Sequence, residues 1–576
     1  MERVEDTLLP AFRGAIEAKP HTAVYKMHKY FARRPWNVFS ELIAHYSSPE
    51  EIVLDPFSGG GVTIVEALRL RRRAVGVDVN PLAVYVTRME SSPLDIDQFK
   101  KAIATVSSNT KDYILSLYST RCPRCGSKAY ADWIEWDEPH HGIIRLKYCC
   151  IMCGKPGLKR PSREDVLLAD EVERNFMEKV IEQRLWFPKA QIPLGDKTSS
   201  LIRKGVTHFH QLFTRRNLLA LATLFKEIER GNSPETEFLK FAFSSSLKWV
   251  SRQSHLRGRI VEGWALHAYW TYPRTLEINV WNTFERRTRA IIRGKQYSNL
   301  ELGDFYKPAT YFEDLRADSN CLLLNTSSTK LPIPDNSIDV IVTDPPYGGN
   351  VNYGELSDFW WVWLQDKTVE KLGEAIINRS QNKSLEAYEN ILTSVFKECF
   401  RVLKPGRKFV STFNSKDARV VTSFIIALTT AGFKINNEAV SYQTPIKAYS
   451  TTIHAMQIGA FAGDFIFTFT KPNQPDPALT NVNWHGLPNF KKNLSQLISE
   501  NITTEVTEAQ LRERAYKLMI PFIAAAGDSS PAPETCREAA DFFEEQIREH
   551  LSHFKNQRKL IIKSRKRNFR TTRRNH

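Results

Sequence analysis

The stretch Val340-Ile-Val-Thr-Asp-Pro-Pro-Tyr-Gly-Gly-Asn350 decides the fold of this chain. It opens with three β-branched apolar residues, which are typical of a strand buried on both faces. Asp344 follows, and two prolines then prevent the chain from continuing a strand or a helix. A surface turn is one interpretation, because Asp-Pro often opens turns. Open α/β sheets, however, bind ligands at the carboxyl ends of their strands, so the stretch also predicts a site that presents Asp344 and Tyr347.

A second strand and loop lie in the first third of the chain. Glu51-Ile-Val-Leu-Asp-Pro-Phe-Ser-Gly-Gly-Gly-Val-Thr63 has the pattern of a buried strand, a glycine loop and the start of a helix. The next predicted strand ends in Asp78, an acid suited to bind both hydroxyls of a ribose. A dinucleotide cofactor would require a glycine at the position of Ile64. Asp55 favours a cationic, amino-bearing ligand, and S-adenosylmethionine fits these features better.

Three motifs carry a resemblance to a known family. Asp55 to Thr63 resembles the D-P-F-x-G-x-G-x-T motif of amino-group DNA methyltransferases, and Asp344 to Tyr347 resembles their catalytic D-P-P-Y. His28 to Pro35 resembles the N-terminal motif that helps to hold the methionine end of the cofactor in that family. The longer stretch from Asp344 to Leu364 is similar to adenine-specific DNA methyltransferases that carry a zinc ribbon.

The resemblance covers roughly residues 20–160 and 200–470 and implies a fold and a set of site residues. We expect a doubly wound, Rossmann-like α/β sheet that binds S-adenosylmethionine, with its last strands antiparallel. The residues expected at the cofactor are His28, Tyr30, Asp55, Phe57, Gly59, Gly61, Thr63 and Asp78. The residues expected at the reacting base are Asp344, Pro345, Pro346 and Tyr347.

Five of the eight cysteines fall within one short segment. Cys122-Pro-Arg-Cys125-Gly and Cys150-Ile-Met-Cys153-Gly form two Cys-x-x-Cys knuckles around a predicted hairpin. Four thiolates at this spacing suit tetrahedral Zn²⁺, and a glycine after each pair allows the tight turn. We therefore predict a structural zinc ribbon with Cys149 as the spare cysteine, although a pairing of Cys149 with Cys153 stays open.

Basic residues dominate the composition and gather in one region. Lys and Arg total 80 against 64 Asp and Glu, a formal charge of +16 that favours a polyanionic partner such as nucleic acid. Trp249, Arg252, Arg257 and Arg259 combine aromatic and basic groups that suit DNA contact. A helix with a solvated face is the alternative. The last 22 residues, 555–576, hold ten Lys or Arg and no acid, which favours either a nucleic-acid-attracting arm or a merely solvating tail.

These patterns divide the chain into five parts. They are the N-terminal part of the methyltransferase domain (1–120), the zinc ribbon (121–158), a helical target-recognition region (159–300), the C-terminal part of the domain (301–472) and a helical extension with a basic tail (473–576). No apolar run is long enough for a membrane span, and the N-terminus lacks the layout of a signal peptide. We expect a cytoplasmic, prokaryotic, nucleoid-associated protein, with a cognate nuclease or defence protein as a candidate partner.

The resemblance also implies a reaction. Asp344 and the Pro345 carbonyl would accept the two N–H bonds of an adenine N6 amine, and Tyr347 would stack on the flipped base of double-stranded DNA. Methyl transfer would then be direct, and the absence of a Pro-Cys nucleophile motif argues against C5-cytosine chemistry. N4-cytosine methylation, RNA guanine-N2 methylation and a non-enzymatic DNA-binding zinc protein are the alternatives. The last of these leaves the three acids Asp55, Asp78 and Asp344 unexplained.

Overall fold

The computed structural model describes most of the chain. The described residues are 12, 16–138, 142–435, 440–443, 464–473, 486–500, 511–512, 514–520, 522 and 534–549. The strand expected near Ile458 and the basic tail lie outside them. Within these ranges no helix combines the length and apolarity that crossing a bilayer requires.

The largest sheet has eight strands and is mostly parallel. Its order is β10 (Pro308–Ala309), β11 (Cys321–Leu324), β2 (Arg73–Val77), β1 (Ile52–Asp55), β12 (Ile338–Thr343), β13 (Leu403–Phe413), β15 (Asp464–Thr470) and β14 (Val440–Gln443). The pairings from β10 to β13 are parallel, and those of β15 with β13 and β14 are antiparallel. β14 therefore runs with the parallel strands, and β15 alone among the described strands of this sheet is reversed.

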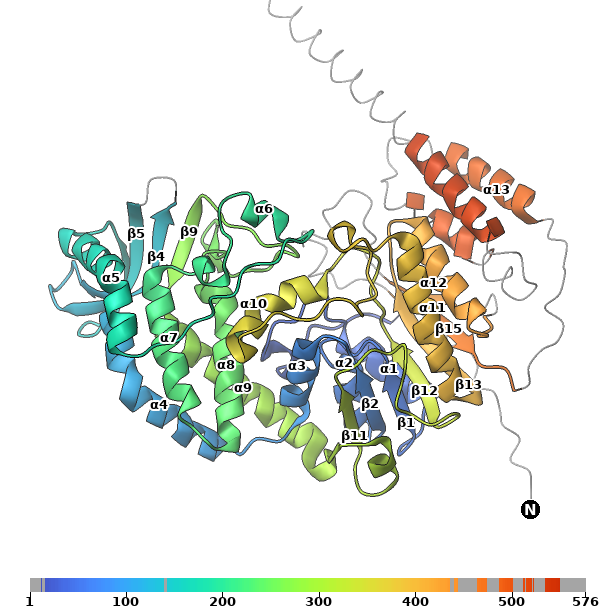
Figure 1. Cartoon of the computed structure of the whole chain (residues 1–576), viewed down its shortest axis with the longest axis horizontal. Helices are drawn as coiled ribbons and strands as arrows, with labels where there is room; N and C mark the ends of the chain where they lie inside the picture. Colours follow the sequence, from blue (N-terminus) through green and yellow to red (C-terminus); the bar gives the residue numbers. More distant parts are fainter. Residues whose placement is uncertain are drawn as a thin grey trace, which may run out of the picture.

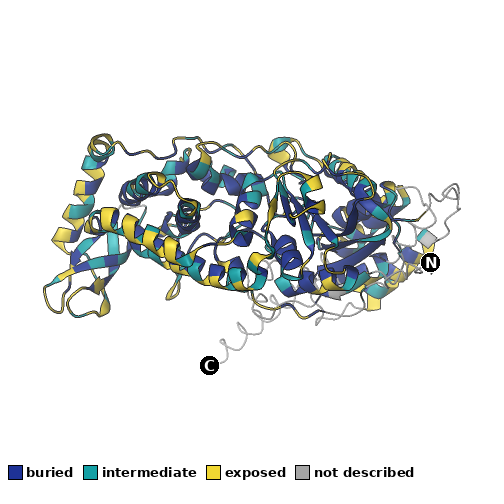
Figure 2. Ribbon diagram, turned by 90° about the horizontal axis from the view of Figure 1, so that it is seen from below, coloured by how far each residue is buried: buried dark blue, intermediate teal, exposed yellow. Residues whose placement is uncertain are grey.

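Both faces of this sheet are covered, as the apolar run in β12 predicted. Val340 and Val342 join the core formed with α1 (Trp36–Tyr46), α2 (Val62–Arg69) and α3 (Pro81–Ser91). Ile341 points the other way and joins the core formed with α11 (Leu385–Val402) and α12 (Ala418–Thr430). Alternate residues of a strand point to opposite faces, so a doubly covered strand must be apolar throughout. Figure 2 shows these strands buried.

A second lobe follows α4 (Ile96–Ser116) and is built on a smaller antiparallel sheet (Figure 1). Its strands are β3 (Ser119–Arg121), β4 (Lys128–Asp137), β5 (Gly142–Cys150), β6 (Pro156–Lys159) and β9 (Arg274–Ile278), with β9 paired to β4. Its helices include α5 (Arg163–Glu182), α6 (Ser199–Ile202), α7 (Arg215–Glu229), α8 (Pro234–Val250) and α9 (Val280–Leu302). Because β9 returns from far along the chain, the cysteine-bearing sheet and the helical region share one framework.

The helix α10 (Tyr353–Gln365) joins the two halves of the molecule. Its Trp360 and Trp363 are each 1% exposed, so this aromatic segment belongs to the core, as its sequence favoured. Trp360 packs on Trp264, and Trp363 packs on Phe243 of α8, with ring centres 5.4 and 5.3 Å apart. The turn that carries Asp344 is therefore followed by a helix with rigid support.

The C-terminal extension packs on the large sheet's α11 and α12 side. α13 (Gly486–Glu500) and the helical residues 514–520 and 534–549 contribute to the same apolar core as those two helices. Glu544 accepts a hydrogen bond from the Ala418 amide at the start of α12, at 2.8 Å. The extension thus packs against the half of the chain that carries the large sheet.

Candidate functional site

A cavity lies at the carboxyl ends of β1, β2 and β12, where the sequence predicted a ligand. Its empty space amounts to about 870 Å³, including the open solvent at its mouth. Residues from the N-terminal motif, the glycine loop, the end of β2 and the Asp344 turn line it. They include Tyr30, Arg33, Arg34, Asp55, Phe57, Gly59, Thr63, Asp78, Asn80, Asp344, Pro346, Tyr353 and Glu374.

The glycine loop reaches the cavity because two of its glycines adopt left-handed backbone angles. Gly59 has φ +46° and Gly61 has φ +77°, values that side chains disfavour. A Cβ atom on Gly61 would also lie 2.6 Å from the Thr87 hydroxyl of α3. Gly59 lines the cavity, whereas Gly61 caps α2 and lets it approach α3.

Asp55 connects the glycine loop to the Asp344 turn. Its carboxylate accepts hydrogen bonds from the hydroxyls of Thr63 and Thr343, each at 2.6 Å, and from the Phe57 amide at 3.1 Å. Thr343 immediately precedes Asp344 in β12, so two motifs almost 300 residues apart share one buried carboxyl. Burial raises the pKa of Asp55 to about 7, and the three donors offset part of that shift.

Asp78 lies at the end of β2 and organises the base of the cavity. Its two oxygens accept from the amides of Gly59 and Asn80, at 2.9 and 2.8 Å. The Asn80 side chain donates to Ser357 of α10 at 2.7 Å, which ties β2 to the helix after the Asp344 turn. Burial raises the pKa of Asp78 to about 6. Tyr30 lines the same part of the cavity, stacked on Tyr353 with ring centres 5.9 Å apart.

Glu374 is a cavity residue that the sequence analysis did not single out. Its side chain is buried, and Oε1 accepts from the Gly354 amide at 3.1 Å. Oε2 has no hydrogen-bond partner among the described residues, although it is shielded from solvent. Burial raises the pKa of Glu374 to about 7. A buried acceptor without a donor, in the wall of a cavity, is available to a ligand.

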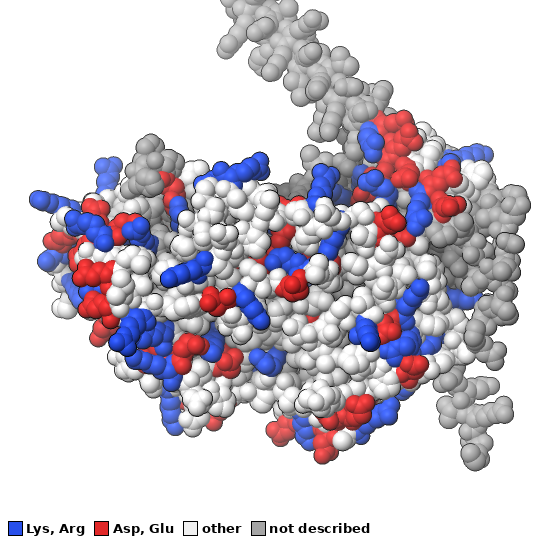
Figure 3. Space-filling model, viewed as in Figure 1, with Lys and Arg blue, Asp and Glu red and all other residues white. Residues whose placement is uncertain are grey.

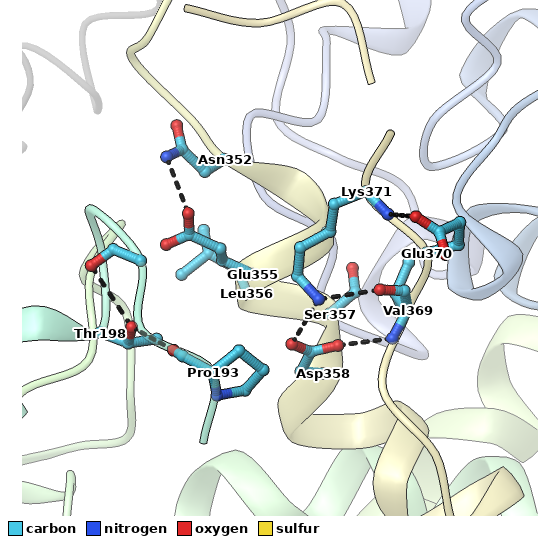
Figure 4. A network of polar contacts seen from close by, with 12 residues as sticks. Pro193, Thr198, Asn352, Glu355, Leu356, Ser357, Asp358, Val369, Glu370 and Lys371 are labelled. Carbon is cyan, nitrogen blue, oxygen red and sulfur yellow. Dashed lines mark hydrogen bonds and ion pairs between the residues drawn. The ribbon is translucent and has the colours of Figure 1, made fainter. Parts of the chain in front are cut away.

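The loop that carries Glu374 is held in place by a polar network on α10 (Figure 4). Lys371 forms an ion pair with Asp358 at 3.0 Å and donates to the Val369 carbonyl at 2.8 Å. The Val369 amide donates back to Asp358 at 2.6 Å. This network folds the loop against the helix and so positions Glu374. No local sequence pattern marks the residue, because its contacts depend on this folded loop.

The Asp344 turn brings several polar groups together at the rim of the cavity. Asp344 Oδ1 accepts from the hydroxyls of Tyr347 and Thr412, at 2.5 and 2.6 Å, and Oδ2 accepts from Arg34 Nε at 2.5 Å. The Pro346 carbonyl accepts from the Tyr388 hydroxyl at 2.7 Å, which secures the turn. Burial raises the pKa of Asp344, and the Arg34 guanidinium acts against that shift.

Comparison with known proteins identifies relatives of the segments that carry this site. The profile of a family described as DNA methylase, covering N6 and N4 enzymes together, matches residues 13–88 and 338–517. The chain is 26% identical over 89 residues to the Type II methyltransferase M.MjaII of Methanocaldococcus jannaschii, covering 16% of this chain and 15% of the relative. It is 22% identical over 358 residues to the Type II methyltransferase M.MvaI of Kocuria varians, covering 60% and 57%.

These matches support the resemblance of the chain to a family of DNA methyltransferases. The two matched segments contain the glycine loop and the Asp344 turn, which the structure brings together around the cavity. The chain spans little more than half the length of the relative from Kocuria varians. The mixed, parallel-rich sheet fits a methyltransferase fold.

Two residues expected at the methyltransferase cofactor, Gly61 and His28, are not among the residues that line the cavity. His28 is buried, with its ring stacked on Phe241 of α8 at 5.1 Å and its nitrogens next to the Lys29 carbonyl and the Ser244 hydroxyl. It is not among the cavity-lining residues, because it packs the N-terminal motif onto α8. Burial lowers the pKa of His28 to about 3, so the imidazole is neutral.

The four cysteines of the two knuckles lie together in the part of the chain that the methyltransferase profile does not match. Their sulfurs all lie within 4.8 Å of one another, with Cys122 to Cys153 at 3.9 Å and Cys125 to Cys150 at 3.5 Å. Zinc–sulfur bonds of about 2.3 Å would place tetrahedral ligands roughly 3.8 Å apart, so the cluster fits a zinc ion. Gly126 and Gly154 both have positive φ, as the knuckle turns require.

The four residues expected at DNA divide into two groups. Arg257 and Arg259 are exposed on the hairpin of β7 (His255–Arg257) and β8 (Ile260–Glu262). Arg252 instead forms an ion pair with Glu138. The Trp249 ring packs so closely over Gly263 that a Cβ there would lie 2.8 Å from it. Of the four, only the hairpin pair is fully exposed, whereas Trp249 and Arg252 are half-buried.

Proposed function

We propose that the chain is an S-adenosylmethionine-dependent DNA methyltransferase that modifies the N6 amine of adenine. The observation that carries the proposal is that Asp344 lines the same cavity as the glycine loop and accepts a hydrogen bond from the Tyr347 hydroxyl. S-adenosylmethionine supplies a methyl group on a sulfonium centre. The family profile and the Type II methyltransferase relatives support this class of reaction.

The charges around the cavity favour this cofactor over a phosphate-bearing one. Asp78 and Glu374 present carboxyl groups to the cavity, which suit an ammonium, a sulfonium or ribose hydroxyls. Two arginines also line it, but each is paired with an acid. Arg33 binds Glu90 with both oxygens, at 2.7 and 2.8 Å, and Arg34 binds Asp344. The charge of each lining arginine is thus balanced by a carboxylate that a pyrophosphate would have to displace, although Nη2 of Arg33 is buried without a hydrogen-bond partner among the described residues.

The chain's own residues can prepare an exocyclic amine for transfer. An adenine amine is a weak nucleophile because its lone pair is delocalised into the ring. Asp344 would accept one N–H bond and so localise the lone pair and stabilise the developing positive charge. The Pro346 carbonyl is already bonded to Tyr388, which leaves the Pro345 carbonyl for the second N–H bond. Tyr347 would stack on the flipped base.

The same proposal covers the accessory parts of the chain. The four-cysteine cluster would hold a structural Zn²⁺, because four thiolates leave no open position for a substrate. Double-stranded DNA would be the substrate, in a cytoplasmic setting near the nucleoid. A cognate nuclease or another defence protein would be the partner in a restriction-modification context, which the Type II relatives support.

The test is methyl transfer from labelled S-adenosylmethionine to DNA and to RNA, followed by digestion to nucleosides. We expect N6-methyladenine from DNA. Asp344→Ala should reduce transfer by about 10²-fold or more while retaining cofactor binding, because it removes an interaction made at the reacting amine. Label in N4-methylcytosine or in RNA guanine would change the assigned substrate. Full activity of Asp344→Ala would contradict the mechanism.

A further inference from the structure

Arg34 occupies the position that the proposed mechanism assigns to the target base. Its Nε donates to Asp344 at 2.5 Å, and its Nη1 donates to Asp464 at the start of β15, at 3.0 Å. The centre of its guanidinium lies 4.6 Å from the centre of the Tyr347 ring. One side chain thus uses both the carboxylate and the aromatic face that a base would need.

The guanidinium resembles an amino-bearing base in the features that this site recognises. It is flat and delocalised, donates N–H bonds in its plane and stacks on aromatic rings. Asp344 Oδ1 is already bonded to Tyr347 and Thr412, so Oδ2 is the oxygen open to a further donor, and Arg34 holds it. A base and Arg34 therefore compete for the same atoms.

The surrounding contacts allow Arg34 to move without loosening the N-terminal motif. Its neighbour Arg33 anchors the segment through the bidentate pair with Glu90, whose side chains are 5% and 0% exposed. The Arg34 side chain is 19% exposed. Asp464 offers a second carboxylate that can keep the guanidinium paired after it leaves Asp344.

We propose that Arg34 is a place-holder for the target base and contributes to its selection. In the DNA-free protein it would fill the base subsite, and an entering base would exchange with it. The exchange keeps Asp344 hydrogen-bonded in the same way only when the entering base has an exocyclic amine. An N–H bond of that amine then replaces the one that Arg34 donated to Asp344. Adenine meets this condition, whereas thymine has a carbonyl oxygen in place of the amine and can offer Asp344 only its ring N3–H. The inference rests on the proposed function and adds a specificity-determining residue to it.

Binding of isolated bases tests the inference without DNA or catalysis. The probes are 9-methyladenine and 1,3-dimethylthymine, which has no N–H bond, with affinities measured by ligand-observed NMR titration of the full chain. We expect Arg34→Ala to bind 9-methyladenine at least tenfold more tightly than the wild type, with no gain for 1,3-dimethylthymine. The gain should vanish when Asp344→Ala is added. Arg289→Ala, which removes an arginine from an exposed ion pair on α9, is the matched control and should behave as the wild type.

Two results would overturn the inference. One is equal affinity for 9-methyladenine in the wild type and Arg34→Ala. The other is an equal gain in affinity for both bases, which would indicate that the substitution only opens a cavity without selectivity. Arg34→Gln, which shortens the side chain and removes its charge, carries the same expectation if the alanine variant does not fold. A gain in adenine binding in a protein whose wild type transfers no methyl group would uphold the place-holder and reject the proposed function.

Discussion

Four carboxyl groups in the wall of the cavity have raised pKa values, those of Asp344, Asp55, Asp78 and Glu374. Burial moves the pKa of Asp55 and of Glu374 to about 7 and that of Asp78 to about 6. Asp55 is committed to three donors of the protein, and Asp78 to two. Glu374 differs from both because Oε2 has no donor among the described residues. It is therefore the carboxyl whose environment would change most when a ligand enters.

Glu374→Gln should weaken cofactor binding roughly tenfold or more. The Gly354 amide requires an acceptor, so the carbonyl oxygen of the new amide would face Gly354. The NH₂ group would then point into the cavity, where it opposes a donor of the cofactor. A hydrogen bond to a charged group contributes about 1.5–3 kcal/mol, which corresponds to this loss or more. Titration calorimetry with S-adenosylmethionine measures it, and unchanged affinity would contradict the role of Glu374.

The thermal stability of Glu374→Gln should show that its loss of cofactor affinity does not come from unfolding. The folded pKa of Glu374 lies above its ordinary value, so ionising the group costs stability, and the cost grows as pH rises from about 4.5 to 7. Without cofactor, Glu374→Gln should match the wild type near pH 4.5 and melt at a higher temperature at pH 8. Wild-type cofactor affinity should fall as pH drops below about 7, because an ionised acceptor is lost.

The cysteine cluster gives a prediction about one structural element. Cys125, in the turn between β3 and β4, and Cys149, in β5, are both exposed, but only Cys125 belongs to the four-sulfur group. Cys125→Ser should lose bound zinc and lower the melting temperature, because metal binding contributes directly to folding. Cys149→Ser should keep one zinc per chain. Metal analysis and thermal unfolding compare the two, and equal zinc loss would contradict the predicted ligand set.

Local elements followed from the sequence where a strong pattern existed. The strand, glycine loop and helix start predicted over Glu51–Thr63 correspond to β1 and the start of α2, because a buried apolar run and glycines mark them. The antiparallel pairing of β15 with β13 agrees with the antiparallel last strands that were expected, whereas the strand β14 was not predicted. The pairing of β9 with β4 was not, because it joins segments about 140 residues apart. The five-part division of the chain stays a prediction.

The site was predictable only as far as its motifs. The glycine loop and the Asp344 turn were recognised from short patterns, and the structure brings them to one cavity. Arg34 lay in a recognised motif, but its partner is 310 residues away, so its role needed the fold. A basic and aromatic pattern likewise could not distinguish Arg252, which is paired with Glu138, from the exposed Arg257.

Across the whole molecule, positive charge is unevenly distributed. Ten of the lysines and arginines lie in residues 555–576, so much of the formal charge of +16 belongs to that tail. On the face shown in Figure 3, basic and acidic side chains of the described residues are interspersed. The exposed hairpin arginines stand next to a segment packed on α10, where the Tyr269 hydroxyl donates to the Glu355 carbonyl at 2.8 Å. DNA contact near the site is therefore expected at the hairpin.

Replacing both hairpin arginines, Arg257→Ala with Arg259→Ala, should weaken DNA binding at every sequence. Each phosphate that an arginine neutralises adds about 0.9 to the slope of log affinity against log salt, so the slope of the double variant should be smaller by up to roughly 1.8. Fluorescence anisotropy at several salt concentrations measures the slope. Arg289→Ala with Arg293→Ala on α9 is a matched pair of exposed arginines that should leave the slope unchanged. An unchanged slope in the hairpin variant would exclude direct binding of phosphates by these arginines.

The buried Asp55 has a consequence for how two ligands influence each other's binding. It is bonded both to Thr63 in the cofactor loop and to Thr343 beside Asp344, so order imposed on one motif extends to the other. Cooperativity between two ligands is reciprocal at equilibrium. If the bound cofactor raises the affinity for a flipped base by some factor, the bound base raises the affinity for the cofactor by the same factor. An enzyme linked in this way would release its spent cofactor most readily after its DNA has left.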